Sequence, residues 1–349
     1  MTIDPNKLDA FLGRFVADLG ATMSAPLVVL GDRLGLYKGL EAGGSQTPAE
    51  LAERTGCAER YVREWLCNQV AGGYVSYDGE GFFLSEEQAF CLADESSPAF
   101  VPGGLLLAMS TVLDRDKIEE RFRTGEPLGW HEHHHDLFDG TEQFFRPGYA
   151  GNLVSAWIPA LDGVEAKLAA GATVADVGCG HGASTLILAE AFPESSFVGF
   201  DYHQASVDAA RKRAADAGIG DRVTFEVAGA SDFPGRGYDL VTFFDCLHDM
   251  GDPVGAARHV SQALAPDGTW MVVEPFANAT LEENLNPVGR IFYGASTTIC
   301  MPSGLSGGGL GLGNQVSDER WAELLLPAGF ATCGRVAETP FNRIFELRH

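Results

Sequence analysis

A short glycine-rich segment at residues 176–182, between an apolar strand pattern and a helix pattern, constrains the fold of this chain most. The segment reads Asp-Val-Gly-Cys-Gly-His-Gly. Glycine lets the backbone turn sharply after a strand and lets a ligand approach the backbone closely. A helix that begins directly after such a turn presents unpaired N–H groups to that ligand. The segment therefore predicts a ligand site at a strand–turn–helix junction.

Strand and helix patterns alternate through the second half of the chain. Apolar strand patterns lie at 173–177, 196–200, 222–227, 240–244 and 269–274, with helix patterns at 183–191, 206–217 and 253–264. This alternation is typical of a parallel, doubly wound sheet. Two further strand patterns, 329–336 and 340–347, are separated by only a few residues and must therefore pair antiparallel. We expect an α/β fold, a Rossmann-like sheet with an antiparallel C-terminal strand pair.

The first part of the chain is predicted to be mainly helical. Apolar residues recur at helical spacing over 8–19 and 26–40, and a further helix is expected over 58–70. Thr47 and Glu50 form a capping-box pattern at another helix start. A hairpin pattern, 74–77 with 82–85, follows these helices.

The order helix, turn, helix and hairpin is that of a winged helix. We expect three regions: a winged-helix or dimerisation domain at 1–97, a helical linker region at 98–163 and a ligand-binding domain at 164–349.

Charge and composition exclude several classes of partner. The 349 residues include 24 Lys and Arg against 48 Asp and Glu, a formal net charge of −24. Nucleic acid is disfavoured because non-specific affinity for it comes from basic side chains. The uncharged apolar stretches 25–30 and 103–109 are too short to span a membrane, and no signal peptide is visible. Seven scattered cysteines argue against a disulfide framework. We expect a cytoplasmic protein with no membrane or nucleic-acid partner.

The next strand along the chain ends in Asp201, where a carboxylate can bind the hydroxyls of a ribose. The turn is therefore interpreted as a nucleoside site. Gly178, Gly180 and Ala183 also satisfy a dinucleotide pattern. Asp176 argues against NAD, because its charge would repel a pyrophosphate but attract a ligand that carries an ammonium group.

On these motifs, residues 172–347 resemble a class I S-adenosylmethionine-dependent methyltransferase. The resemblance implies S-adenosylmethionine as the cofactor, with Asp232 near the adenine amine, Phe233 against the adenine ring and Asp245 beside the methionine part. The expected cofactor-binding residues are Asp176, Gly178, Cys179, Gly180, Asp201, Tyr202, Ser231, Asp232, Phe233 and Asp245. With the winged-helix front, the chain resembles small-molecule O-methyltransferases.

His248 is the candidate general base. It follows the fourth strand, at the sheet edge where open α/β sheets bind ligands. In the O-methyltransferases that this segment resembles, a Leu-His-Asp-Trp run supplies the catalytic histidine. In this sequence Met250 stands in place of the tryptophan. Glu274 resembles the acid that flanks this histidine. A second flanking acid would fall near Gln315, which carries no charge.

Four histidines lie within residues 131–135. If the segment is extended, His131, His133 and His135 share one face and suit zinc or copper. A solvated bridging segment and a polar wall of the acceptor cleft are the other interpretations, and we assign no metal ligand. The glycine-rich stretch 302–315 is interpreted as a flexible substrate lid.

The sequence thus predicts methyl transfer to a hydroxyl of a small, apolar or aromatic molecule, by a homodimer paired through its N-terminal domain. Alternatives are an N-methyltransferase, a non-methylating S-adenosylmethionine enzyme, and a winged-helix regulator with a nucleoside-sensing domain. An NAD-dependent dehydrogenase is a third class, for which no catalytic geometry is visible.

Overall fold

The computed structural model describes residues 3–349, which form two compact units. The first unit comprises the chain up to Val112 together with His135–Pro147, and the second comprises Leu113–His134 and Gly148–His349. The segment 98–163, expected as a linker, is shared between the two units.

The first unit is built from one long helix and several short ones, with a small hairpin. Its elements are α1 (Pro5–Arg33), α2 (Leu36–Gly43), α3 (Pro48–Thr55), α4 (Glu59–Ala71), β1 (Ser76–Tyr77), β2 (Phe82–Phe83), α5 (Glu86–Leu92) and most of α6 (Pro102–Leu113). The capping box is confirmed: the Thr47 hydroxyl accepts from the Glu50 backbone N–H, and the Glu50 carboxylate accepts from the Thr47 N–H. β1 and β2 pair antiparallel, as expected for the wing.

The two helices expected at 8–19 and 26–40 are instead one long helix and one short helix. α1 continues through Pro26 and ends at Arg33, and α2 begins at Leu36. The break lies at Gly35, whose φ of +67° is the left-handed conformation that glycine adopts freely. The prediction was wrong because it ended the helix ahead of the proline.

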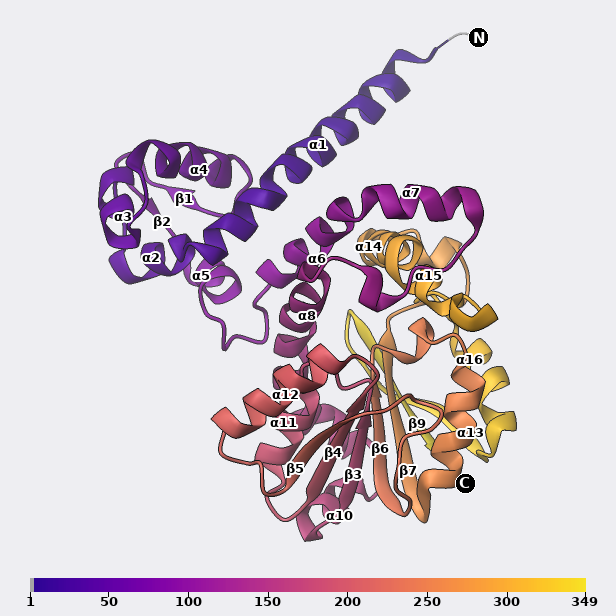
Figure 1. Ribbon diagram of the computed structural model, residues 1–349. Helices are drawn as coiled ribbons and strands as arrows, with labels where there is room; N and C mark the ends of the chain where they lie inside the picture. Colours follow the sequence, from indigo (N-terminus) through magenta and orange to yellow (C-terminus); the bar gives the residue numbers. More distant parts are fainter. Residues whose placement is uncertain (1–2) are drawn as a thin grey trace. The chain divides into compact units, whose positions relative to one another are not determined.

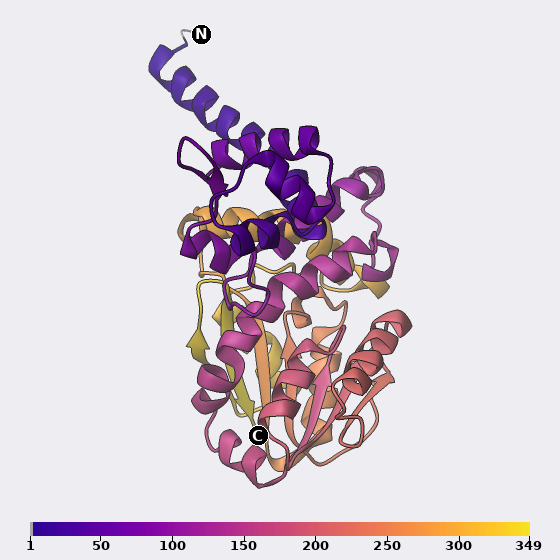
Figure 2. The same cartoon turned by 90° about the vertical axis from the view of Figure 1, so that its left-hand side faces the viewer.

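Apolar side chains lie exposed along α1 between Leu8 and Met23, and the N-terminal end of this helix extends beyond the rest of its unit (Figures 1 and 2). They recur at helical spacing and each is more than two-fifths exposed: Leu8, Phe11, Leu12, Phe15, Val16, Leu19 and Met23. By length and composition alone, α1 is the one helix among residues 3–349 that could cross a membrane.

The second unit contains a seven-stranded sheet in the order β5-β4-β3-β6-β7-β9-β8. The strands are β3 (Thr173–Val177), β4 (Ser196–Asp201), β5 (Val223–Val227), β6 (Tyr238–Phe244), β7 (Leu264–Pro275), β8 (Thr332–Glu338) and β9 (Asn342–Arg348). The first five are parallel, whereas β9 pairs antiparallel with both β7 and β8. The predicted α/β fold with an antiparallel C-terminal pair is confirmed.

Helices cover both faces of this sheet. α11 (Ala183–Ala191) and α12 (Gln204–Asp216) lie on one face, and α13 (Pro253–Ala263) and α16 (Asp318–Leu325) lie on the other (Figure 1). The core between the sheet and α13 and α16 includes the buried side chains of Val177, Phe243, Trp270 and Trp321.

The strand order reverses between β3 and β6, and open α/β sheets bind ligands at such a switch point. α7 (Arg115–Thr124), α14 (Pro287–Ala295) and α15 (Met301–Gly304) lie beyond the carboxyl ends of the parallel strands (Figures 1 and 2). The remaining helical segments of the chain are η1 (Trp130–Glu132), α8 (Asp136–Asn152), η2 (Leu153–Trp157), α9 (Ile158–Ala160), α10 (Val164–Ala170), η3 (Leu247–Asp249), η4 (Glu282–Asn284), η5 (Ser296–Cys300), η6 (Ser306–Gly308) and η7 (Leu326–Ala328).

Candidate active site

The turn after β3 has the geometry that its glycines predict. Gly178, Gly180 and Gly182 all have positive φ values, of +73°, +51° and +79°. A Cβ atom added at Gly178 would lie 2.6 Å from Cys246 Sγ, whereas one added at Gly180 would meet nothing within 4 Å. Gly180 therefore leaves an open cradle at the sheet edge. Such a cradle fits the close approach of a nucleoside cofactor to the backbone.

The Asp176 carboxylate, near the end of β3, connects the start of this turn to neighbouring elements. It accepts hydrogen bonds from the hydroxyls of Ser184 (2.7 Å), Thr185 (2.5 Å) and Thr242 (3.0 Å). Burial raises its pKa above 3.8, against the effect of these donors. The sequence placed this carboxylate beside the ligand's ammonium group, but both of its oxygens are occupied by side chains of α11 and β6. Asp176 therefore ties these elements to the end of β3.

Asp201, at the end of β4, contacts the same turn. Its Oδ2 accepts from the Gly180 N–H at 3.0 Å, and its Oδ1 accepts from the His203 N–H at 2.8 Å. Burial raises the pKa of this carboxyl above 3.8. The carboxylate is thus held beside the open cradle at Gly180, where a ribose could reach its remaining lone pairs. Tyr202, half-exposed, lies next to it.

The segment expected to hold adenine is only partly open. Asp232 accepts from the Gly229 N–H at 3.0 Å and is exposed, as is Ser231. The Phe233 ring is 1% exposed, stacks on Phe200 with centroids 5.2 Å apart and belongs to the core. Contact of Phe233 with adenine stays a prediction.

Asp245 is the only residue other than glycine with a positive φ among residues 3–349, at +49°. Strained backbone of this kind concentrates at functional sites. Its Oδ2 accepts from Tyr149 Oη at 2.7 Å, and Asn342 Nδ2 donates to both of its oxygens. Burial raises the pKa of Asp245 to about 8. The sequence did not identify Tyr149 or Asn342, because neither lies in a recognisable motif.

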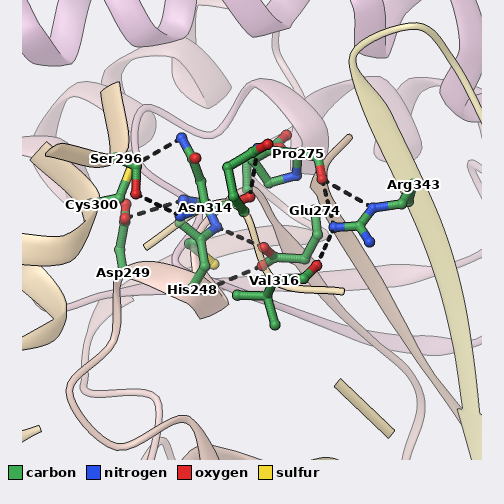
Figure 3. Close-up of polar contacts among 12 residues, drawn as sticks. His248, Asp249, Glu274, Pro275, Ser296, Cys300, Asn314, Val316 and Arg343 are labelled. Atoms are coloured by element: carbon green, nitrogen blue, oxygen red, sulfur yellow. Dashed lines mark hydrogen bonds and ion pairs between the residues drawn. The ribbon is translucent and has the colours of Figure 1, made fainter. Parts of the chain in front are cut away.

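His248 lies between two carboxylates (Figure 3). Its Nδ1 is 2.7 Å from Glu274 Oε2, and its Nε2 is 3.1 Å from Asp249 Oδ1. Glu274, near the end of β7, also accepts from the His248 backbone N–H at 3.3 Å. The structure therefore brings together the two residues that the sequence selected for catalysis.

The charge state of His248 follows from these neighbours. Burial favours the neutral ring, but the carboxylates of Asp249 and Glu274 outweigh it and raise the His248 pKa well above 6.5. These carboxylates therefore favour the protonated form of the ring in the ligand-free protein. To act as a base, His248 must first lose the proton on Nε2. For this, Nε2 must contact another group in place of the Asp249 carboxylate.

Trp130 contacts the other oxygen of Asp249, and no motif in the sequence predicts a role for it. Its Nε1 donates to Asp249 Oδ2 at 2.8 Å.

The segment around Trp130 is a 3₁₀ turn, so the extended arrangement that would align His131, His133 and His135 on one face is wrong. His133 is buried, with Nδ1 2.9 Å from Asp114 Oδ2.

The glycine-rich stretch 302–315 folds over the same region. Leu310 N–H donates to the Gly251 carbonyl, and Gly311 N–H donates to the Gly304 carbonyl. Gln315, at the expected position of the second flanking acid, donates to the Phe276 carbonyl at 3.2 Å. Within the described chain, Glu274 and Asp249 are therefore the carboxylates that contact His248.

Comparisons with known proteins agree with this geometry. A family profile described as a methyltransferase domain matches residues 168–314, and one described as an Rv2258c-like winged HTH domain matches residues 22–94. A curated relative, 27-O-demethylrifamycin SV methyltransferase of Amycolatopsis mediterranei, is 33% identical over 103 residues, 29% of this chain and 38% of the relative. The chain thus spans about two-fifths of the length of the first curated relatives that it matches.

Two solved structures extend the likeness to the whole chain. An O-methyltransferase family protein from Burkholderia thailandensis has a TM-score of 0.70 at 18% identity, covering 100% of this chain and 99% of that one. Human N-acetylserotonin methyltransferase, solved with S-adenosylmethionine, has a TM-score of 0.72 at 16% identity, with the same coverage. At these identities the likeness shows the fold. The two domain matches, with the turn after β3, identify an S-adenosylmethionine-dependent methyltransferase domain at residues 168–314, preceded by a winged HTH domain at residues 22–94.

Proposed function

We propose that this protein transfers the methyl group of S-adenosylmethionine to a hydroxyl of a small, apolar or aromatic molecule, with His248 as the general base. The single observation that carries the proposal is the buried pair of His248 and Glu274 at the carboxyl edge of the sheet. The names of two similar proteins, 27-O-demethylrifamycin SV methyltransferase and an O-methyltransferase family protein, support oxygen as the acceptor atom. N-methylation or another use of the cofactor has no specific observation in its favour.

The cofactor would be held by the turn after β3 and by the strand ends beside it. Gly178, Cys179 and Gly180 would supply backbone, Asp201 would supply a carboxylate for the ribose, and Asp245 is proposed to lie beside the methionine part. Tyr202, Ser231, Asp232 and Phe233 are proposed for the adenosine. When bound, the sulfonium supplies an activated methyl group that needs an aligned nucleophile and no further activation.

The residues of the chain would align the acceptor and take its proton. His248 Nε2 would accept the proton of the acceptor hydroxyl as that oxygen takes up the methyl group. Alignment of the two reactants supplies much of the barrier reduction. Glu274 would keep the ring oriented through Nδ1 and stabilise the imidazolium that forms.

The acceptor hydroxyl must displace Asp249 from Nε2 before His248 can act. Loss of that carboxylate neighbour lowers the His248 pKa, and a nearby sulfonium charge lowers it further, because both changes disfavour the imidazolium. Trp130, which donates to Asp249 Oδ2 at 2.8 Å, would remain a partner of that carboxylate after Nε2 has left it. The raised pKa of the ligand-free ring is therefore compatible with a base in the ternary complex.

Substitution of the base tests the proposal. His248→Gln should lower kcat on the order of 10²–10⁴-fold, because proton removal by a side chain contributes that much. The dissociation constant for S-adenosylmethionine should stay near that of the wild type. Glu274→Gln should cause a smaller loss, since its amide can still orient the ring. His349→Gln, at the exposed chain end, is the matched control. Unchanged turnover of His248→Gln with the acceptor would remove the base assignment.

The N-terminal unit is proposed to pair two copies of the chain. The exposed apolar stripe on α1 is the kind of surface that another chain covers. A nucleic-acid role is disfavoured, because the ion pairs Arg60–Glu64 and Arg63–Glu59 neutralise α4 within the helix. A cytoplasmic location is proposed because all seven cysteines are free.

A further inference from the structure

A buried cluster of nitrogen, oxygen and sulfur atoms lies at the carboxyl edge of the sheet. One ring nitrogen of His248, one carboxylate oxygen of Asp249 and the Sγ of Cys300 all lie within 4.8 Å of one another (Figure 3). The three residues are 3%, 8% and 6% exposed. Cys300 has no part in the proposed methyl transfer, so the cluster contains a nucleophile that this function leaves unused.

Asp249 leaves a buried oxygen without a well-formed hydrogen bond. Its Oδ1 lies 3.1 Å from His248 Nε2 but accepts no hydrogen bond of acceptable geometry from the described residues. An unsatisfied buried carboxylate oxygen is costly. A cation between Oδ1, Nε2 and Sγ would satisfy it, and this oxygen already faces the other two donor atoms.

Each donor is also held by an outer partner, as metal ligands in proteins usually are. Glu274 accepts from His248 Nδ1 at 2.7 Å, which leaves the lone pair of a neutral ring on Nε2. Trp130 Nε1 donates to the other oxygen of Asp249 at 2.8 Å. Asn314 Nδ2 donates to Cys300 Sγ at 3.5 Å. The carboxylate–histidine pair recurs beside zinc in proteins.

The backbone of the segment η5 determines where the Cys300 sulfur lies. Cys300 ends the π-helical segment η5, Ser296–Cys300, whereas His248 and Asp249 are neighbours in the 3₁₀ turn η3. Single π turns occur frequently at functional sites because they redirect side chains from the regular helical face.

We propose that His248 Nε2, Asp249 Oδ1 and Cys300 Sγ bind a thiophilic divalent cation, Zn²⁺. A thiolate and an imidazole favour zinc over magnesium or calcium, which prefer oxygen ligands. Zinc forms bonds to the three atoms while the thiol proton and any proton on Nε2 leave to solvent. Three protein ligands leave a fourth position open for water.

Zn²⁺ bound at this site would block methyl transfer, and this consequence rests on the proposed function. The metal takes the Nε2 lone pair that the base needs, so Zn²⁺ acts as an inhibitor at this site. Metal binding itself does not depend on His248 being a base.

Metal content after equilibrium dialysis against ZnCl₂ tests the binding without any activity measurement. Wild-type protein should retain one zinc per chain, and Cys300→Ala should retain none. Cys333→Ala, which removes a partly buried thiol in β8, is the matched control and should behave like the wild type. With CoCl₂, the wild type should show a thiolate-to-cobalt charge-transfer absorption that Cys300→Ala lacks.

Asp249→Asn serves as a second variant, should Cys300→Ala fold poorly, and should bind zinc at least tenfold more weakly. A wild type that retains no zinc would overturn the site, as would equal zinc in Cys300→Ala. In a methyl-transfer assay, ZnCl₂ should inhibit the wild type but spare Cys300→Ala, and EDTA should restore activity. Zinc bound at the site without inhibition would contradict the role of His248, not the metal site.

Discussion

At the scale of single residues, three carboxylates near the carboxyl edge of the sheet are stabilised in different ways. Asp176 is satisfied by three hydroxyls, and Glu274 by a histidine. Asp245 accepts from Tyr149 and Asn342, both neutral donors, and its pKa is raised to about 8. Ionisation of Asp245 therefore costs the ligand-free protein stability.

The stability of the ligand-free protein should depend on Asp245 in a defined direction. A carboxyl whose folded-state pKa is raised contributes stability that is present below 3.8 and is lost as pH rises through about 8. The melting temperature of the wild type relative to Asp245→Asn should therefore fall across this interval. Differential scanning calorimetry over a pH series measures it. Asp221→Asn, which removes an exposed carboxylate, is the control. A difference in melting temperature between wild type and Asp245→Asn that does not change with pH would contradict the raised pKa of Asp245.

At the scale of secondary-structure elements, sequence patterns predict the second unit closely and α1 poorly. β3 and α11 begin and end where the strand and helix patterns do, because Gly182 marks the boundary between them. In α1, the helical pattern on both sides of Pro26 outweighs the local cost of a proline, and the helix ends only at Arg33, shortly before Gly35. The partners of Asp249 and Asp245 come from segments without a motif, so no spacing rule could identify them.

The exposed stripe of α1 should pair two chains. Phe11 and Phe15 are 60% and 56% exposed on one face, and placing a charge there disfavours burial against a second copy. The double variant Phe11→Asp with Phe15→Asp should change the mass in light scattering from two chains to one chain of 37.2 kDa. Ala17→Asp adds a charge to the opposite face and should leave the dimer intact. A wild type of single-chain mass would refute this pairing.

At the scale of the whole chain, the sequence identifies the fold of the second unit and the pair of His248 and Glu274. It does so because parallel strands end at one edge, which brings residues far apart in the sequence together. It does not predict how the segment 98–163 divides between two units, nor the turn that buries His133 against Asp114. These features depend on long-range packing, which hydrophobic periodicity does not encode.

Calorimetric titration with S-adenosylmethionine tests the central claim most directly. The wild type should bind one molecule per chain, and Asp201→Ala should bind it much more weakly, because it removes the carboxylate beside the Gly180 cradle. Asp221→Ala, an exposed aspartate outside the proposed cofactor site, should bind like the wild type. Well-folded wild-type protein that gives no binding heat with either S-adenosylmethionine or S-adenosylhomocysteine at several temperatures would contradict the account.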